Sequence, residues 1–131
     1  MNAVAVLAVR RHGAPPALVV ALVRALGNPG WADRRLAAFA LGRLGDGGDL
    51  PALVRAAHDT SSFVREAVAS ALVNTPAALD ALLALSRDDV PQVRAAAARS
   101  LGTLKDDRAH QRRGELVADP DPSVRAAAGG N

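Results

Sequence analysis

The chain has 131 residues, of which 50% are hydrophobic but only 2% aromatic, and its formal net charge is +3. This length suits one domain, and the scarcity of aromatic residues leaves Ala, Leu and Val to form its core. The absence of cysteine excludes disulfides and thiolate metal sites.

The amino-terminal residues include an apolar run at 3–9 that is too short to span a bilayer. Arg10 and Arg11 follow this run, whereas a secretory signal carries its positive charge before the apolar stretch. We therefore expect a soluble, cytoplasmic protein without a membrane partner.

Helices are predicted along the whole chain, because no segment alternates with the period of a strand. A degenerate helix is expected at 2–11 and a second helix at 15–26. Clear helical stripes follow at 33–42, 64–72 and 93–102, with apolar helices at 50–54 and 79–85 between them. A weaker helix holds Leu116 and Val117, and a short one begins at Val124. The fold class is all-α, with roughly eight helices in antiparallel pairs.

An acidic residue or asparagine stands six positions before an arginine at four places in the chain. The arginines follow one another at intervals of 31, 29 and 31 residues, and this fixed period indicates stacked repeats. We call the helix that carries the arginine helix A and the following helix B. The pairs are Asn28/Arg34, Asp59/Arg65, Asp88/Arg94 and Asp119/Arg125.

Two motifs give this repeat a family resemblance. The motif Asp-x-Asp-Pro-x-Val-Arg-x-Ala-Ala at 119–128, with Leu-Gly-x-Leu-x-Asp at 41–46 and 101–106, resembles HEAT repeats. The likeness covers about residues 14–128 and is closest to the short variety known as bilin-lyase-like HEAT repeats. It implies a right-handed α-solenoid of about four helix pairs, an armadillo-like helical fold. It also implies that the B helices line a concave face that usually binds other macromolecules.

The repeat spacing predicts a single domain over 1–131. A degenerate repeat is expected at 1–29, three repeats at 30–59, 60–88 and 89–119, and a truncated repeat at 120–131. In the third repeat Arg113 takes the place of a leucine, and we expect Gly114 to break the helix. The last A helix is short enough to fray. The protein is therefore predicted to be a monomer, or to self-associate weakly through the apolar end at 105–131.

The recurring pair of an acid or asparagine with an arginine is interpreted as structural. The loop residue can satisfy free amides at a helix start, and the arginine can reach the loop of its own repeat or of the next one. Because a catalytic site would occur once, repetition favours a ladder of bonds that hold the stack together.

Candidate catalytic and metal-binding residues do not form a pattern. His12, His58 and His110 lie at different phases of the repeat. The HEAT-like deoxyhypusine hydroxylases hold iron with His-Glu pairs, but none of these histidines is followed by glutamate. No catalytic residue, metal or cofactor is predicted. A remnant of such an enzyme, or of a bilin lyase, remains an alternative.

Function is predicted to lie on residues that do not repeat. Arg24 and Arg55 share one phase of successive B helices and, extended by Arg87, predict a positive ridge. We expect this ridge to contact an unidentified protein, which makes the chain a non-enzymatic scaffold or adaptor. Nucleic acid is the alternative partner, since the same arginines can meet phosphates. Trp31 is expected to fill a gap between loops rather than to anchor a partner.

Overall fold

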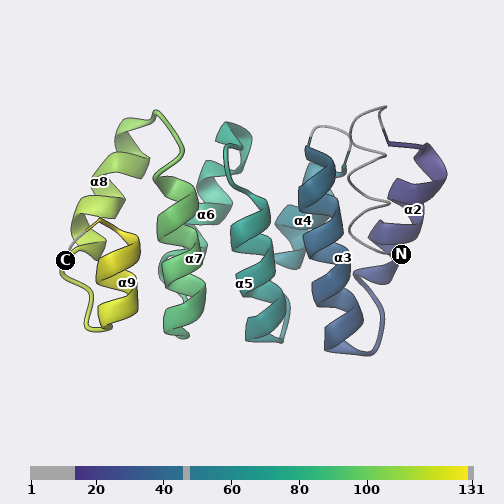
Figure 1. Cartoon of the computed structure of the whole chain (residues 1–131), viewed down its shortest axis with the longest axis horizontal. Coiled ribbons are helices and arrows are strands. Elements are labelled where there is room, and N and C mark those ends of the chain that lie inside the picture. Colours follow the sequence, from purple (N-terminus) through teal and green to yellow (C-terminus); the bar gives the residue numbers. More distant parts are fainter. Residues whose placement is uncertain (1–13, 46–47, 130–131) are drawn as a thin grey trace.

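The computed structural model describes residues 14–45 and 48–129, and over these ranges it contains eight α-helices, one short 3-10 helix and no strand (Figure 1). The all-α prediction is confirmed. The predicted helix at 2–11 lies outside the described residues. The helices are α2 (Pro16–Ala25), α3 (Trp31–Leu44), α4 (Leu50–Ala56), α5 (Ser62–Ala71), η2 (Pro76–Ala78), α6 (Leu79–Leu85), α7 (Pro91–Leu101), α8 (Asp107–Leu116) and α9 (Pro122–Ala127).

The helices form two layers. Figure 1 shows the A helices α3, α5, α7 and α9 side by side in one row, with the B helices α4 and α6 behind them and the B helices α2 and α8 at the two ends of the row. Each A helix packs against the next, and α2, α4 and α6 each pack against the A helix that follows them in the chain. This arrangement is a short α-solenoid, as predicted.

The core is built from the same positions in successive repeats. Val64, Val93 and Val124, each directly before a ladder arginine, are fully buried. Leu41, Leu72 and Leu101, each seven residues after a ladder arginine, are also fully buried. Burial of one such side chain stabilises the folded state by about 1.5–3 kcal/mol. The repeated valine and leucine positions therefore supply much of the cohesion between neighbouring A helices.

Small residues let adjacent A helices approach closely. A Cβ atom added to Gly42 in α3 would lie 2.5 Å from the Cβ of Ala71 in α5. One repeat further, the buried hydroxyl of Ser100 in α7 donates to the carbonyl oxygen of Ala69 in α5 at 2.6 Å. The side chains at these contacts are small enough for backbone atoms to take part in them directly.

The B helix of the third repeat, α8, corrects one prediction. Helix α8 continues through Gly114, so the expected break is wrong. The Asp106 side chain caps its start by accepting from the amides of Arg108 and Ala109, and Leu116 is buried near its end. A cap and a buried apolar face together outweigh the cost of about 1 kcal/mol for one glycine in a helix.

The last A helix, α9, is six residues long and begins at a cap formed by the Asp121 side chain. It packs against α7, and both Val124 and Ala128 are buried there. Fraying of this helix stays a prediction. No helix among the described residues is long and apolar enough to cross a membrane.

Candidate interaction surfaces

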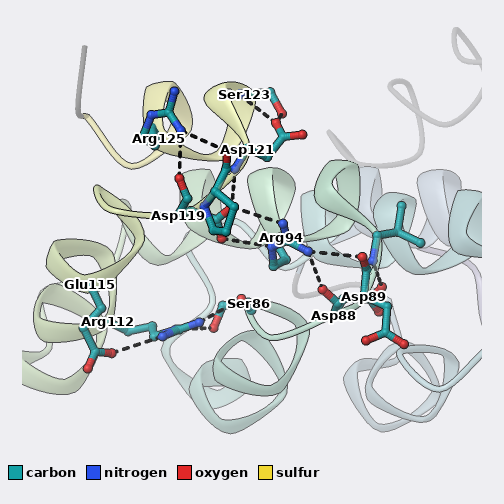
Figure 2. A network of polar contacts seen from close by, with 12 residues as sticks. Ser86, Asp88, Asp89, Arg94, Arg112, Glu115, Asp119, Asp121, Ser123 and Arg125 are labelled. Carbon is teal, nitrogen blue, oxygen red and sulfur yellow. Dashed lines mark hydrogen bonds and ion pairs between the residues drawn. The ribbon is translucent and has the colours of Figure 1, made fainter.

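The ladder arginines lie between two loops. Arg94 is one of them: its Nη1 donates to the carbonyl oxygens of Asp88 (2.8 Å) and Asp89 (3.2 Å) in the loop that precedes its own helix. Its Nε and Nη2 donate to the two carboxylate oxygens of Asp119, at 3.0 and 3.1 Å (Figure 2). One guanidinium therefore ties its own repeat to the loop that starts the next.

The same geometry recurs in the preceding repeats. Arg34 binds the backbone of Asn28 and Pro29 and the carboxylate of Asp59. Arg65 binds its own loop and the carboxylate of Asp88 in the same way. The side chains of the three arginines and their aspartates are only 7–19% exposed. The sequence suggested the own or the next loop as partner, and the structure brings each of these arginines to both.

The ladder aspartates also organise their own loops. One carboxylate oxygen of Asp59, Asp88 and Asp119 accepts from the amide two residues later, at 2.8–2.9 Å. Asn28 makes the equivalent bond to the Gly30 amide. Each of these bonds closes a short turn in its loop and holds the carboxylate or amide side chain in place.

Electrostatics favour the charged forms of the ladder. Burial tends to raise the pKa values of Asp59 and Asp88, but hydrogen bonds from Arg34 and Arg65 and from the loop amides outweigh it, so both pKa values lie below their usual range. For Asp119, the bonds from Arg94 are the largest influence and lower its pKa. The rungs are therefore ion pairs at neutral pH.

The two ends of the ladder differ from its middle. Arg125 donates from Nη1 to the carbonyl oxygens of Asp119 (2.9 Å) and Pro120 (3.0 Å), but no carboxylate of the described residues pairs with it. At the other end, the Asn28 side chain accepts only from Gly30 within the described part of the chain. The structure thus forms three complete rungs from the four predicted pairs.

The predicted ridge arginines lie on the B layer. Arg24 is in the last turn of α2, Arg55 is in the last turn of α4, and Arg87 follows the end of α6. All three are exposed, and none forms an ion pair with a carboxylate in 14–45 or 48–129. Arg24 and Arg55 line separate hollows, Arg24 beside Asp49 and Arg55 beside His58.

The histidines give no metal site in the described structure. His58 and His110 are exposed, and His12 lies outside the described residues. Within residues 14–45 and 48–129, no three His, Cys, Asp or Glu side chains gather as ligands of one ion would.

An open groove of about 1140 Å³ lies on the A layer between α3 and α5. Leu36, Phe39 and Phe63 contribute exposed apolar surface to it, and 47% of Phe39 and 51% of Phe63 are exposed. Trp31 stacks on Phe63 across the two repeats, with ring centroids 4.8 Å apart, and 44% of it is exposed. All three aromatic residues of the chain therefore gather beside one groove.

The groove also carries charge. Arg35 and Arg43 line it from α3, and Glu66 lines it from α5. The Arg43 guanidinium lies over the Phe39 ring, with 5.9 Å from its Cζ to the ring centroid. The repeat pattern of the sequence does not predict this groove. A helical wheel would have placed Trp31, Arg35 and Phe39 on one face of α3.

The comparisons with known proteins agree with the repeat geometry. The family model described as HEAT repeats matches the chain twice, at residues 1–73 and 72–130. No curated protein matches the chain. The paired helices, the two layers and the two family matches lead to one conclusion: the chain belongs to the HEAT repeat family.

Proposed function

We propose that the chain is a non-enzymatic HEAT-repeat module, a scaffold or adaptor that binds another protein. HEAT repeats generally serve as protein-interaction scaffolds. The observation that carries the proposal is the contrast between the bonded ladder arginines and the exposed ridge arginines. Arg34, Arg65 and Arg94 are bonded inside the stack, whereas the ridge arginines on the B layer are exposed and form no ion pair with described residues. Exposed guanidinium groups are well suited to the carboxylates of a partner.

We also propose that the repeats are of the short, bilin-lyase-like variety. The intervals of 31, 29 and 31 residues between ladder arginines support the short, bilin-lyase-like variety of the repeat. They also support repeat boundaries at 30–59, 60–88 and 89–119. A cytoplasmic location is part of the proposal and is tested by fractionation of the native host.

The test compares partner capture by charge variants. The wild-type chain and Arg24→Glu/Arg55→Glu are used as bait in the native host, and bound proteins are identified by mass spectrometry. Arg99→Glu, which reverses an exposed charge on the A-layer helix α7, is the matched control. We expect one partner to be captured by wild type and control but lost from the double variant. Equal capture by all three baits would rule out the ridge as the contact site.

Nucleic acid is distinguished by salt dependence. Phosphate binding weakens steeply between low and moderate ionic strength. Gel-shift titrations with DNA and RNA at low salt therefore separate the two partner classes. If DNA or RNA binds in a salt-sensitive way and Arg24→Glu/Arg55→Glu abolishes that binding, the partner of the ridge is nucleic acid and not a protein.

A further inference from the structure

The groove between α3 and α5 collects side chains that the repeat does not require. Phe39 of α3 corresponds by repeat position to Ser70 in α5 and to Arg99 in α7. The two phenylalanines of the chain nevertheless both line this groove, and its single tryptophan stacks on one of them, each ring residue being between 44% and 51% exposed. Exposed apolar patches of this kind mark contact sites, and aromatic residues contribute most to binding at them.

The charge along the groove is uneven. Its α3 wall carries Arg35 and Arg43, and neither forms an ion pair with a described carboxylate. The Nε of Arg43 is buried and has no hydrogen-bond partner among the described residues, while its guanidinium lies over Phe39. The opposite wall carries Glu66. A carboxylate on a ligand that lies along α3 would therefore find two cations.

We propose that this groove binds a short amphipathic helix of a partner protein, with its apolar face on the aromatic residues and carboxylates along the edge that faces α3. The groove lies between two neighbouring helices, the geometry in which an amphipathic helix binds. Trp31 and Phe39 are eight residues apart on α3, about 12 Å along its axis, which matches about two turns of a ligand helix.

The groove is less suited to a nucleic acid strand. Bases bind by stacking on open aromatic faces, but Trp31 and Phe63 already stack on each other. Leu36 and Val73 add exposed aliphatic surface, which suits the apolar face of a helix better than it suits a stacked base. The proposed ligand is thus an acidic peptide helix, bound on the layer opposite the arginine ridge.

Trp31 makes the proposal directly measurable. As the single tryptophan, it reports burial at the end of the groove through a blue shift of its emission. Three display libraries of helical peptides of about sixteen residues share randomised apolar positions and differ only in the polar face, which is Glu, Gln or Lys. Each library is selected on the full chain, and the recovered peptides, made without tryptophan, are titrated against Trp31 emission.

The Glu library is expected to give the binders, and Phe39→Ala or Arg35→Glu is expected to weaken them by about tenfold or more. Arg35→Glu/Arg43→Glu should shift the preference to the Lys library. Arg99→Glu, on α7, should leave affinity unchanged, and thermal melts confirm that each variant folds. Because Arg35 and Phe39 are both exposed, their substitution does not disturb the core.

Several results would overturn the proposal. These are equal recovery from all three libraries, no binders from any, or acidic binders that are insensitive to the groove variants. Binders lost only from Arg24→Glu/Arg55→Glu would assign peptide binding to the ridge and leave the proposed function standing without the groove. A dimer in sedimentation that Phe39→Ala abolishes would assign the groove to a second copy. Oligonucleotide binding that depends on Arg35 would assign it to nucleic acid.

Discussion

Arg65 donates from Nε and Nη2 to the two carboxylate oxygens of Asp88, 23 residues later in the chain, at 2.8 and 3.2 Å. The same guanidinium donates from Nη1 to the carbonyl oxygens of Asp59 and Thr60. Asp88 in turn accepts from the Val90 amide. A single side chain therefore fixes two loops that belong to successive repeats, and its removal affects both.

Arg65→Ala is expected to lower the free energy of unfolding by about 2 kcal/mol, because it removes charge-assisted bonds at a largely buried rung. A loss of this size corresponds to a fall of roughly 5–10 °C in melting temperature. Arg65→Lys should recover less than half of the loss, since lysine lacks the planar fork. Arg35→Ala, at an exposed site, is the control. An unchanged melting temperature for Arg65→Ala would refute the ladder.

Acid should weaken the stack through its carboxylates. The pKa values of Asp59, Asp88 and Asp119 lie below their ordinary values in the folded chain. The unfolded chain therefore takes up protons first, so the stabilisation is complete above about pH 5 and is lost as pH falls below about 4, through the folded-state pKa values. Urea denaturation between pH 7 and pH 2 measures this loss.

Two asparagine variants test whether the ladder carboxylates cause the acid sensitivity. Asp119→Asn should be less stable at neutral pH and should lose less stability on acidification. Asp80→Asn, at a carboxylate that is 91% exposed, is the matched control and should leave the acid profile as in wild type. If both variants lose as much stability at low pH as the wild type does, the ladder is not the source of the pH dependence.

Two glycines within helices should respond to alanine in opposite directions. In Gly42→Ala the new Cβ would lie 2.5 Å from the Cβ of Ala71, so α3 and α5 must separate and stability should fall. Gly114 in α8 has open space around the same position, so Gly114→Ala should stabilise by about 0.5–1 kcal/mol. Chemical denaturation of both variants measures the contrast. A stabilised Gly42→Ala would contradict the close approach of the two helices.

Arg112 is expected to hold α8 against the loop after α6. Its Nε donates to the Ser86 hydroxyl at 2.9 Å and its Nη2 to the Ser86 carbonyl oxygen at 3.0 Å, and Ser86 is fully buried. Arg112→Ala should lower stability by about 1–2 kcal/mol and raise amide hydrogen exchange in α8 and α9. Arg108→Ala, at a side chain 67% exposed, is the control. Fast amide hydrogen exchange that is confined to α9 in the wild type would show that this helix alone frays.

The helices were predictable where the repeat is regular. The stripe at 64–72 corresponds to α5 at Ser62–Ala71, and the one at 79–85 matches α6. The error at Gly114 has a physical cause: helix propensity is local, whereas Ala109 and Leu116 gain stability by burial in the apolar clusters of the stack. The period predicted that each ladder arginine would bind the loop of its own repeat or of the next one. That the middle arginines bind both loops depends on the distance between stacked repeats, which the sequence does not give.

The α3/α5 groove was not predictable from the repeat, because it depends on residues that break the repeat. Phe39 and Phe63 stand at different repeat positions, and only the stacking of the two helices places both at one groove. Trp31 stacks on Phe63 across two repeats but keeps 44% of its surface exposed, so its expected role in filling a gap between loops stays a prediction.

The ladder also has an axial polarity. Each complete rung runs from an arginine to the carboxylate of the following repeat, so removal of one repeat leaves a different group exposed at each cut. A cut before Asp119 would leave the Arg94 cation without its anion, and a cut after Arg34 would leave the Asp59 anion without its cation. Two fragments cut between the same repeats therefore carry opposite charges at the matching ends, which favours their reassembly in the native order and disfavours the reverse.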